Sequence, residues 1–244
     1  MIKNYFKIIK NYYFQFCSSK LFLAVLGLKI ISSFLFASNY LTHLFARFVN
    51  YYVVSGFKNP YQFFNQLNEL NAFPYPKIML WILAFPRWFF SFFLSADYNF
   101  VSNFHIFIYR LPILFADIVI FLILADWLKN KKDKILKYYW CSPILFYISY
   151  IHGQLDVLPI MFLFVSLFLL FKEKFYSAFI FLGIAIATKT SIIIAFPFTI
   201  VYLILKRIEP AKILLLALLP IVLFLVVNVN YLISPSFAEM VFHN

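Results

Sequence analysis

The sequence predicts an all-α polytopic membrane protein with about seven transmembrane helices and a long outer loop after the first of them. Three observations support this fold class. Hydrophobic residues make up 64% of the 244 residues and charged residues only 12%, whereas a soluble domain is about half apolar and about a quarter charged. The apolar residues gather in long runs, and Lys and Arg gather between these runs. The composition excludes a soluble globule, a disordered chain and a nucleic-acid-binding domain, even though the net charge is +12.

The first apolar run, residues 21–37, is predicted to be a membrane anchor. It is longer than the apolar core of a signal peptide, which has about 7–15 residues, and no convincing cleavage site of small residues follows it. Lysines precede the run, which predicts a cytoplasmic N-terminus because the cytoplasmic flanks of spans are rich in Lys and Arg. The run 105–128 is long enough to be the second span.

The segment 38–104 between these two spans is predicted to be one outer loop bearing juxtamembrane helices. Its most apolar stretch, 78–94, holds Pro86 and Arg87 near its middle, and an arginine at mid-bilayer costs about 2.5–3.5 kcal/mol of insertion free energy. If this stretch crossed the membrane, the lysine-rich loop 129–137 would lie outside, against the positive-inside bias. We therefore predict that 78–94 lies in the membrane interface.

Two further apolar runs, 138–171 and 175–205, are each predicted to form a hairpin of two short helices. Each run has a polar cluster at its centre, which a single span would bury in lipid. Hairpin arms of about 15 residues, roughly 22 Å long, are shorter than a hydrocarbon core of about 30 Å. The polar turns are therefore expected in a water-filled recess below the outer surface. The predicted spans are 21–37, 105–128, 138–152, 157–171, 175–188, 190–205 and 213–232.

The distribution of charge predicts a multi-pass protein of the cell membrane with a cytoplasmic N-terminus. Of the 21 Lys and Arg residues, 14 fall in predicted inner segments, whereas the much longer outer loop holds four. Cytoplasmic loops carry an excess of Lys and Arg in membrane proteins. We therefore interpret the net charge mainly as a topology signal, with attraction to anionic lipid as a by-product.

Polar residues inside the apolar zone are the candidate functional residues, because ionisable groups in lipid are costly. Arg110 and Lys189 are two cations on the predicted outer half, and together they would suit a phosphate or pyrophosphate. Asp156 is the carboxylate best placed to act as a general base toward an incoming hydroxyl. His152 and Gln154 are candidate substrate contacts in the same polar cluster.

Structural roles stay open for several of these residues. Arg110 and Asp117 are seven residues apart and share a helix face, so they could neutralise each other or neighbouring helices instead of contacting a ligand. His152 could cap a helix end. The many Phe and Tyr residues are interpreted as lipid contacts and interfacial belts. Cys17 and Cys141 are too few for a disulfide framework or a zinc site.

Two motif-bearing segments are YWCSPILFYISYIHGQLDVLPIMF at 139–162 and LGIAIATKTSIIIAFP at 182–197. They resemble the GT-C superfamily of membrane glycosyltransferases, most strongly its bacterial mannosyltransferase-like members and the mannosyl- and glucosyltransferases that use lipid-phosphate sugars. In that family an asparagine- or serine-proline start leads into a short span ending in a G-[QHN]-x-D-like turn, and a later short span carries a lysine before an apolar run and a proline. The matching residues here are Ser142, Pro143, Gly153, Gln154, Leu155, Asp156, Lys189 and Pro197. Further matches are NPY at 59–61, FPYP at 73–76 and RLPILFAD at 110–117, and the likeness covers roughly residues 20 to 240.

The resemblance implies an enzyme that moves a sugar, such as mannose, from a polyprenyl-phosphate donor onto a glycan or lipid acceptor at the outer face. It also implies a seven-span module whose first outer loop contains juxtamembrane helices. The tail of the donor would lie in the bilayer, and its phosphate would reach Lys189 and Arg110. The implied partners are therefore the donor, the acceptor and membrane lipids, and not a nucleic acid. No cofactor is implied with certainty, and because no DxD-type pair is present, the need for a divalent cation stays open.

The chain departs from the family pattern in two places. The family places a catalytic Asp or Glu shortly after the first span, whereas Asn39 occupies about that position here and no acid follows until Glu69. Because an amide cannot act as a base, the remaining outer candidates for this role are Glu69, Asp97 and Asp156. Family members also continue beyond the seventh span, so we expect this chain to be the front part of a longer enzyme.

Two other classes of function stay open. Asn39 favours a pseudoenzyme or binding module that holds a lipid-linked glycan or a partner chain without catalysis. Alternatively, the intramembrane charges Arg110, Asp117 and Lys189 could line the path of a small transporter or lipid flippase. Transporters often carry internal inverted repeats, and the sequence shows none beyond the two short hairpins.

Overall fold

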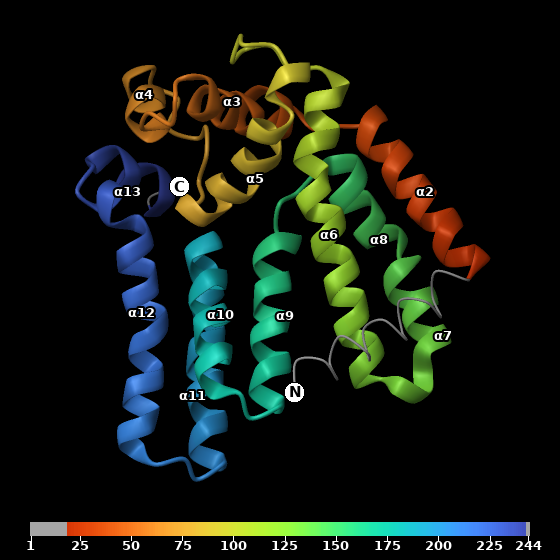
Figure 1. Ribbon diagram of the computed structural model, residues 1–244, viewed down its shortest axis with the longest axis vertical. Helices are drawn as coiled ribbons and strands as arrows, with labels where there is room; N and C mark the ends of the chain where they lie inside the picture. The colour runs from red at the N-terminus through yellow and green to blue at the C-terminus, as the bar shows by residue number, and fades with distance from the viewer. Residues whose placement is uncertain (1–18, 243–244) are drawn as a thin grey trace.

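The described part of the chain is entirely helical in its regular structure, as the sequence predicts (Figure 1). The computed structural model describes residues 19–242, apart from the side chains of residues 130 and 132. Of the four lysines that precede the first apolar run, Lys3, Lys7 and Lys10 lie outside these residues, and Lys20 is the first residue of α2. The first half contains α2 (Lys20–Leu35), η1 (Tyr40–Phe45), α3 (Ala46–Val54), α4 (Pro60–Gln66), α5 (Lys77–Phe89), η2 (Ser91–Phe93) and α6 (Asn103–Trp127).

The second half of the chain is built from shorter helices followed by one long one. After α6 come η3 (Lys129–Lys131), α7 (Lys132–Ile135), η4 (Leu136–Trp140), α8 (Pro143–Phe146), η5 (Tyr147–His152), α9 (Val157–Phe171), α10 (Phe175–Thr188), η6 (Thr190–Ile194), α11 (Ala195–Leu205), α12 (Pro210–Leu232) and α13 (Pro235–Phe242). The breaks between η5 and α9 and between α10 and η6 fall at the two polar clusters of the sequence.

Two helices of the described chain are long and apolar enough to cross a membrane. They are α6, with 25 residues and a mean hydropathy of 2.3, and α12, with 23 residues and a mean hydropathy of 2.7. A third span is formed if α2 and the helix Tyr40–Val54, bent by 63° at the break between them, count as one. The helices Val157–Phe171, Phe175–Thr188 and Thr190–Leu205 are apolar but shorter. These lengths support a membrane protein with two or three spans, and the arrangement with seven stays a prediction.

The long helices pack side by side in a bundle (Figure 1). α10 contacts both α9 and α12, α9 contacts α6, and α6 contacts α2. Close packing of α10 on α12 depends on Gly183, because a Cβ atom at this position would lie 2.9 Å from the Cα atom of Pro220. Small residues allow this kind of close approach between helices in lipid.

A layer of short helices, α3, α4, α5 and α13, lies across one end of the bundle (Figure 1). The apolar stretch predicted to be interfacial forms α5 in this layer, and its 13 residues are too few to cross a bilayer. Arg87 is buried here instead of facing lipid: it donates hydrogen bonds to Asn50 Oδ1 at 2.7 Å and to the carbonyl of Ser95 at 2.7 Å. Burial lowers the pKa of Arg87 from its ordinary value.

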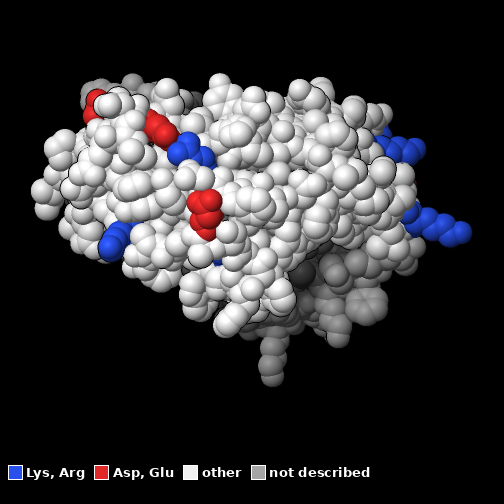
Figure 2. All heavy atoms as spheres, turned by 90° about the horizontal axis from the view of Figure 1, so that it is seen from above, with Lys and Arg blue, Asp and Glu red and all other residues white. Residues whose placement is uncertain are grey.

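This end layer has its own aromatic core. The fully buried ring of Phe48 stacks on Phe73 at 4.8 Å and meets Tyr61 edge-on at 5.0 Å. The interpretation of the aromatic residues as lipid contacts and interfacial belts therefore misses part of their role, because many of them hold this layer of short helices together. Figure 2 shows this end of the molecule: most of the surface carries no charge, and the few acidic and basic side chains are scattered.

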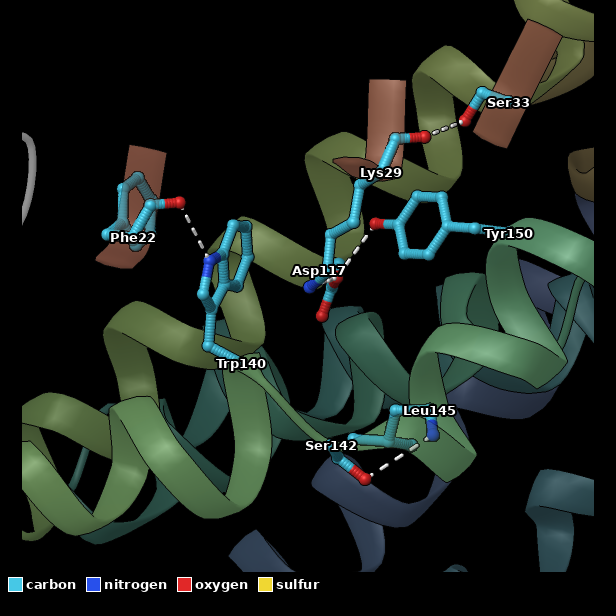
Figure 3. A network of polar contacts seen from close by, with 8 residues as sticks. All are labelled: Phe22, Lys29, Ser33, Asp117, Trp140, Ser142, Leu145 and Tyr150. Carbon is cyan, nitrogen blue, oxygen red and sulfur yellow. Dashed lines mark hydrogen bonds and ion pairs between the residues drawn. The ribbon is translucent and has the colours of Figure 1, made fainter. Parts of the chain in front are cut away.

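A buried ion pair joins α2 to α6 (Figure 3). The Lys29 ammonium lies 2.7 Å from Asp117 Oδ2, and the two side chains are 2% and 7% exposed. The Tyr150 hydroxyl donates to the same Asp117 oxygen at 2.7 Å, and the Lys29 ammonium lies 3.4 Å from the centre of the Trp140 ring. Four elements, α2, α6, η4 and η5, therefore meet at this pair.

We predict that Lys29→Met lowers the free energy of unfolding by about 3–5 kcal/mol, because it leaves Asp117 charged and buried without its cation. Equilibrium unfolding in mixed detergent micelles measures this loss. The double variant Lys29→Met/Asp117→Leu should recover most of it, since no unpaired charge remains.

The matched control is Lys206→Met, which breaks an exposed pair with Glu173. Solvent screens that pair, so a much smaller change is expected. Equal losses in Lys29→Met and Lys206→Met would contradict the structural role assigned to the buried pair.

Candidate functional site

The two polar clusters of the sequence meet at an ion pair. The Lys189 ammonium donates to Asp156 Oδ1 at 2.6 Å, and the side chains are 32% and 38% exposed. Asp156 lies immediately before the first residue of α9, and Lys189 lies in extended conformation between α10 and η6. Both residues therefore sit where a helix is interrupted, and the pair is open enough to exchange partners with a ligand.

The segment between α4 and α5 approaches the pair through Tyr75. Its ring centre lies 5.9 Å from the Lys189 ammonium. Burial raises the pKa of Tyr75 well above its ordinary value, and the negative charge of Asp156 raises it further. The Tyr75 hydroxyl therefore stays protonated and can act as a hydrogen-bond donor near the pair. Tyr75 belongs to the FPYP motif at 73–76. The motif by itself did not predict that Tyr75 would lie beside Lys189.

Arg110 lies in a different environment from the one the sequence predicted. It is 1% exposed and donates to the carbonyl oxygens of Ser149, Phe36 and Ile151 at 2.6, 3.1 and 3.4 Å. It does not pair with Asp117, whose cation is Lys29. These contacts tie the end of α2 and the end of η5 to α6. The two terminal nitrogens of Arg110 therefore bond backbone carbonyls, whereas its enclosed Nε has no hydrogen-bond partner among the described residues. The phosphate-binding role predicted for Arg110 stays a prediction.

Gly153 is the residue that allows Arg110 to reach η5. It has a φ of +85°, which favours glycine, and a Cβ atom there would lie 2.6 Å from Arg110 Nη2. The backbone N–H of Gly153 donates to the carbonyl of Ile148 and ends η5. The turn that follows leads directly to Asp156. The contact between Gly153 and Arg110 therefore helps to fix the turn that carries the partly exposed Asp156.

The two other residues predicted in the polar turn differ in accessibility. His152 is half-buried, and its Nδ1 atom is enclosed without a hydrogen-bond partner among the described residues. Its ring centre lies 6.4 Å from that of Tyr147. Gln154 is exposed beside Asp156 in the sequence. Gln154 is thus free to meet a ligand from solvent, whereas His152 faces the protein.

The acids predicted in the outer loop belong to another cluster. Glu69 accepts hydrogen bonds from Arg47 at 3.2 and 3.3 Å, and Asp97 accepts one from the backbone N–H of Asn99 at 2.9 Å. Asn99 in turn accepts from Arg47 Nε at 2.9 Å. Glu69 and Asp97 are thus linked to each other through Arg47 and Asn99. Of the three predicted acids, Asp156 is the one paired with Lys189.

An apolar groove is lined by helices that include α9 and α10, the two helices next to the ion pair. Its volume is about 780 Å³, and residues of α5, α6, α9 and α10 line it, among them Ile78, Pro112, Phe162 and Ile184. Ile184 precedes Lys189 by five residues, a rise of roughly 7.5 Å along a helix. Ile78 follows Tyr75 by three residues. All the residues that line the groove are apolar, and neither Asp156 nor Lys189 is among them.

Sequence reasoning missed the cluster around Lys29. Lys29 lies within the first predicted span, but the second predicted span holds two aspartates, Asp117 and Asp126, so the sequence does not single out its partner. The sequence also left the need for a divalent cation open. Within residues 19–242, no three His, Cys, Asp or Glu side chains gather in a way that could hold a metal ion.

The chain was compared with known families, proteins and folds. No protein-family model, curated protein or solved structure matches it. The family resemblance therefore rests on the quoted motifs alone. The structure adds that two of these motifs meet through Asp156 and Lys189, which are 33 residues apart in the sequence.

We predict that Gly153→Ala lowers the free energy of unfolding by about 2–4 kcal/mol. Positive φ costs an alanine about 1–2 kcal/mol, and the new methyl group must also displace the Arg110 guanidinium from its carbonyl partners. Unfolding in detergent micelles measures the loss.

Gly56→Ala is the matched control. Gly56 has a φ of +73°, but no atom lies within 4 Å of a Cβ placed there. The control should therefore show only the conformational cost, about 1–2 kcal/mol. If both variants lose the same stability, the contact between Gly153 and Arg110 is not a constraint on the fold.

Proposed function

We propose that the protein is a membrane glycosyltransferase that transfers a sugar from a polyprenyl-phosphate donor to a glycan or lipid acceptor at the outer face. The observation that carries the proposal is the Asp156–Lys189 ion pair. It joins the two motif segments and is partly exposed, and the two helices that flank it, α9 and α10, each contribute a residue to the wall of an apolar groove. This combination suits a ligand that has an anionic head and a long apolar tail.

The proposal includes the seven-span topology. α9, α10, α11 and α12 run alternately toward and away from the layer of short helices (Figure 1). The start of α9 and the end of α10 both face this layer, so the ion pair lies on its side of the bundle. The lysine-rich segment 129–137 follows the opposite end of α6. The positive-inside bias then assigns the layer of short helices to the outer face.

In the proposed reaction, the donor phosphate takes over the Lys189 ammonium and releases the Asp156 carboxylate. The carboxylate accepts the proton of the acceptor hydroxyl as its oxygen attacks the anomeric carbon of the sugar. The new bond joins the anomeric carbon to the acceptor oxygen, and the bond to the phosphate oxygen breaks. Polyprenyl phosphate leaves with its negative charge stabilised by Lys189. Arg110 takes part by positioning the turn that carries Asp156.

One observation favours a second candidate, a module that binds a lipid-linked glycan without catalysis. The family's acid is replaced by Asn39, which is exposed at the start of η1. Glu69 accepts hydrogen bonds from Arg47, and Asp97 accepts one from the backbone N–H of Asn99. In this candidate, Lys189 would hold the phosphate and Asp156 would only orient the lysine.

We predict that Asp156→Asn lowers the rate of transfer by about 10²–10⁴-fold, the usual contribution of a general base, while binding of the donor persists. Lys189→Ala should abolish both donor binding and transfer, because the phosphate loses its cation. Lys189→Arg, which keeps the charge, should retain binding. Transfer from labelled polyprenyl-phosphate sugars in reconstituted vesicles measures the rate.

Membrane insertion and melting temperature serve as controls for each variant. Donor binding without transfer in the unaltered chain would support the binding module. In that case, a gain of transfer in Asn39→Asp would show that the missing acid is the reason. Full activity in both Asp156→Asn and Lys189→Ala would contradict the site itself.

A further inference from the structure

A polar recess lies at the C-terminal ends of α6 and α9, at the other end of α9 from Asp156. Its volume is about 600 Å³. Both helices end here, α6 at Trp127 and α9 at Phe171. Since α9 has 15 residues, the recess lies roughly 22 Å along this helix from the turn that carries Asp156. The lining residues are Asp126, Trp127, Leu128, Lys129, Lys131, Phe171 and Lys172.

The recess carries an excess of positive charge. Three lysines and one aspartate line it, which leaves two positive charges unbalanced. The Asp126 carboxylate is 11% exposed, and its oxygens lie 3.7 Å from the ammonium groups of both Lys129 and Lys172. These distances exceed hydrogen-bond length, so Asp126 holds the two lysines loosely. Each ammonium has three N–H donors and can offer them to an anion.

The recess also has an apolar wall. Phe171 and Leu128 are 52% and 45% exposed, and the Trp127 ring packs on Phe164 and Phe171 with centroids 5.6 and 5.7 Å apart. The enclosed Nε1–H of Trp127 has no acceptor among the described residues. The carbonyl groups at helix C-termini attract lysines, but they do not account for exposed aromatic and aliphatic side chains in the same recess.

We infer that this recess binds the phosphate headgroup of an anionic glycerophospholipid in the leaflet that the lysines face. The phosphodiester would contact Lys129 and Lys172, and the acyl chains would lie against Phe171 and Leu128. Basic residues next to a span attract anionic lipid, and the apolar wall distinguishes a lipid from a free phosphate ion. This site is independent of the proposed transferase activity.

The test uses the full chain reconstituted in phosphatidylcholine vesicles with a trace of photoactivatable phosphatidylglycerol. Crosslinks are expected in residues 126–131 and 171–172, and unlabelled phosphatidylglycerol should compete for them. The Lys129→Gln/Lys172→Gln variant should bind phosphatidylglycerol about 25-fold more weakly, since each lysine near an anionic surface contributes a factor of roughly five.

Two variants keep the result interpretable. Lys134→Gln/Lys137→Gln removes the same charge from exposed lysines of the adjacent segment that do not line the recess, and should lower the affinity far less. Lys129→Arg/Lys172→Arg keeps the charge and should retain binding. Melting temperatures in detergent establish that all three variants are folded.

Two outcomes overturn the inference. An equal loss of affinity in Lys129→Gln/Lys172→Gln and Lys134→Gln/Lys137→Gln would show a diffuse attraction to anionic lipid instead of a site. If soluble glycerol 1-phosphate prevents crosslinking as effectively as phosphatidylglycerol, the recess binds a free phosphate and not a lipid.

Discussion

The rest of the structure depends on the ion pair between Lys29 and Asp117. Two opposite charges that are almost wholly enclosed cannot separate without a large cost in solvation free energy, so α2 is held against α6. Tyr150 shares the carboxylate and brings η5 to the same place. Two turns away on α6, Arg110 binds the carbonyls at the end of η5 and faces Gly153. The position of Asp156 therefore follows from a salt bridge that has no part in the proposed chemistry.

The Lys29–Asp117 and Lys189–Asp156 ion pairs differ in solvent access. This difference indicates a structural role for the first pair and a ligand-binding role for the second. The Lys29–Asp117 pair is almost inaccessible, whereas the side chains of Lys189 and Asp156 are 32% and 38% exposed. A buried pair is difficult to replace because any substitute ligand must also shed its water. A partly exposed pair can exchange one partner for a phosphate with little reorganisation. A lysine–aspartate pair thus holds helices together at Lys29 and Asp117, whereas the pair of Lys189 and Asp156 is a candidate ligand site.

The two ends of the bundle have contrasting surfaces. One end is covered by short helices with an aromatic core and few exposed charges (Figure 2). The other carries the lysine-rich segment and the recess between α6 and α9. Such a difference suits a protein in a bilayer, where cations gather on one side and aromatic side chains lie at the interfaces. The contrast also separates the candidate transfer site from the lipid recess along the length of α9.

The sequence by itself determined the helical class, the presence of apolar helices long enough to span a membrane and the positions where helices break, because these depend on local composition, glycine and the cost of burying charge. It also singled out Asp156 and Lys189 through their motifs. Only the tertiary structure decided which charges meet: Asp117 pairs with Lys29 instead of Arg110, and Glu69 pairs with Arg47. It also decided that much of the aromatic content forms a core in the layer of short helices. Pairing and packing depend on distances between segments far apart in the chain, and spacing along one helix cannot supply them.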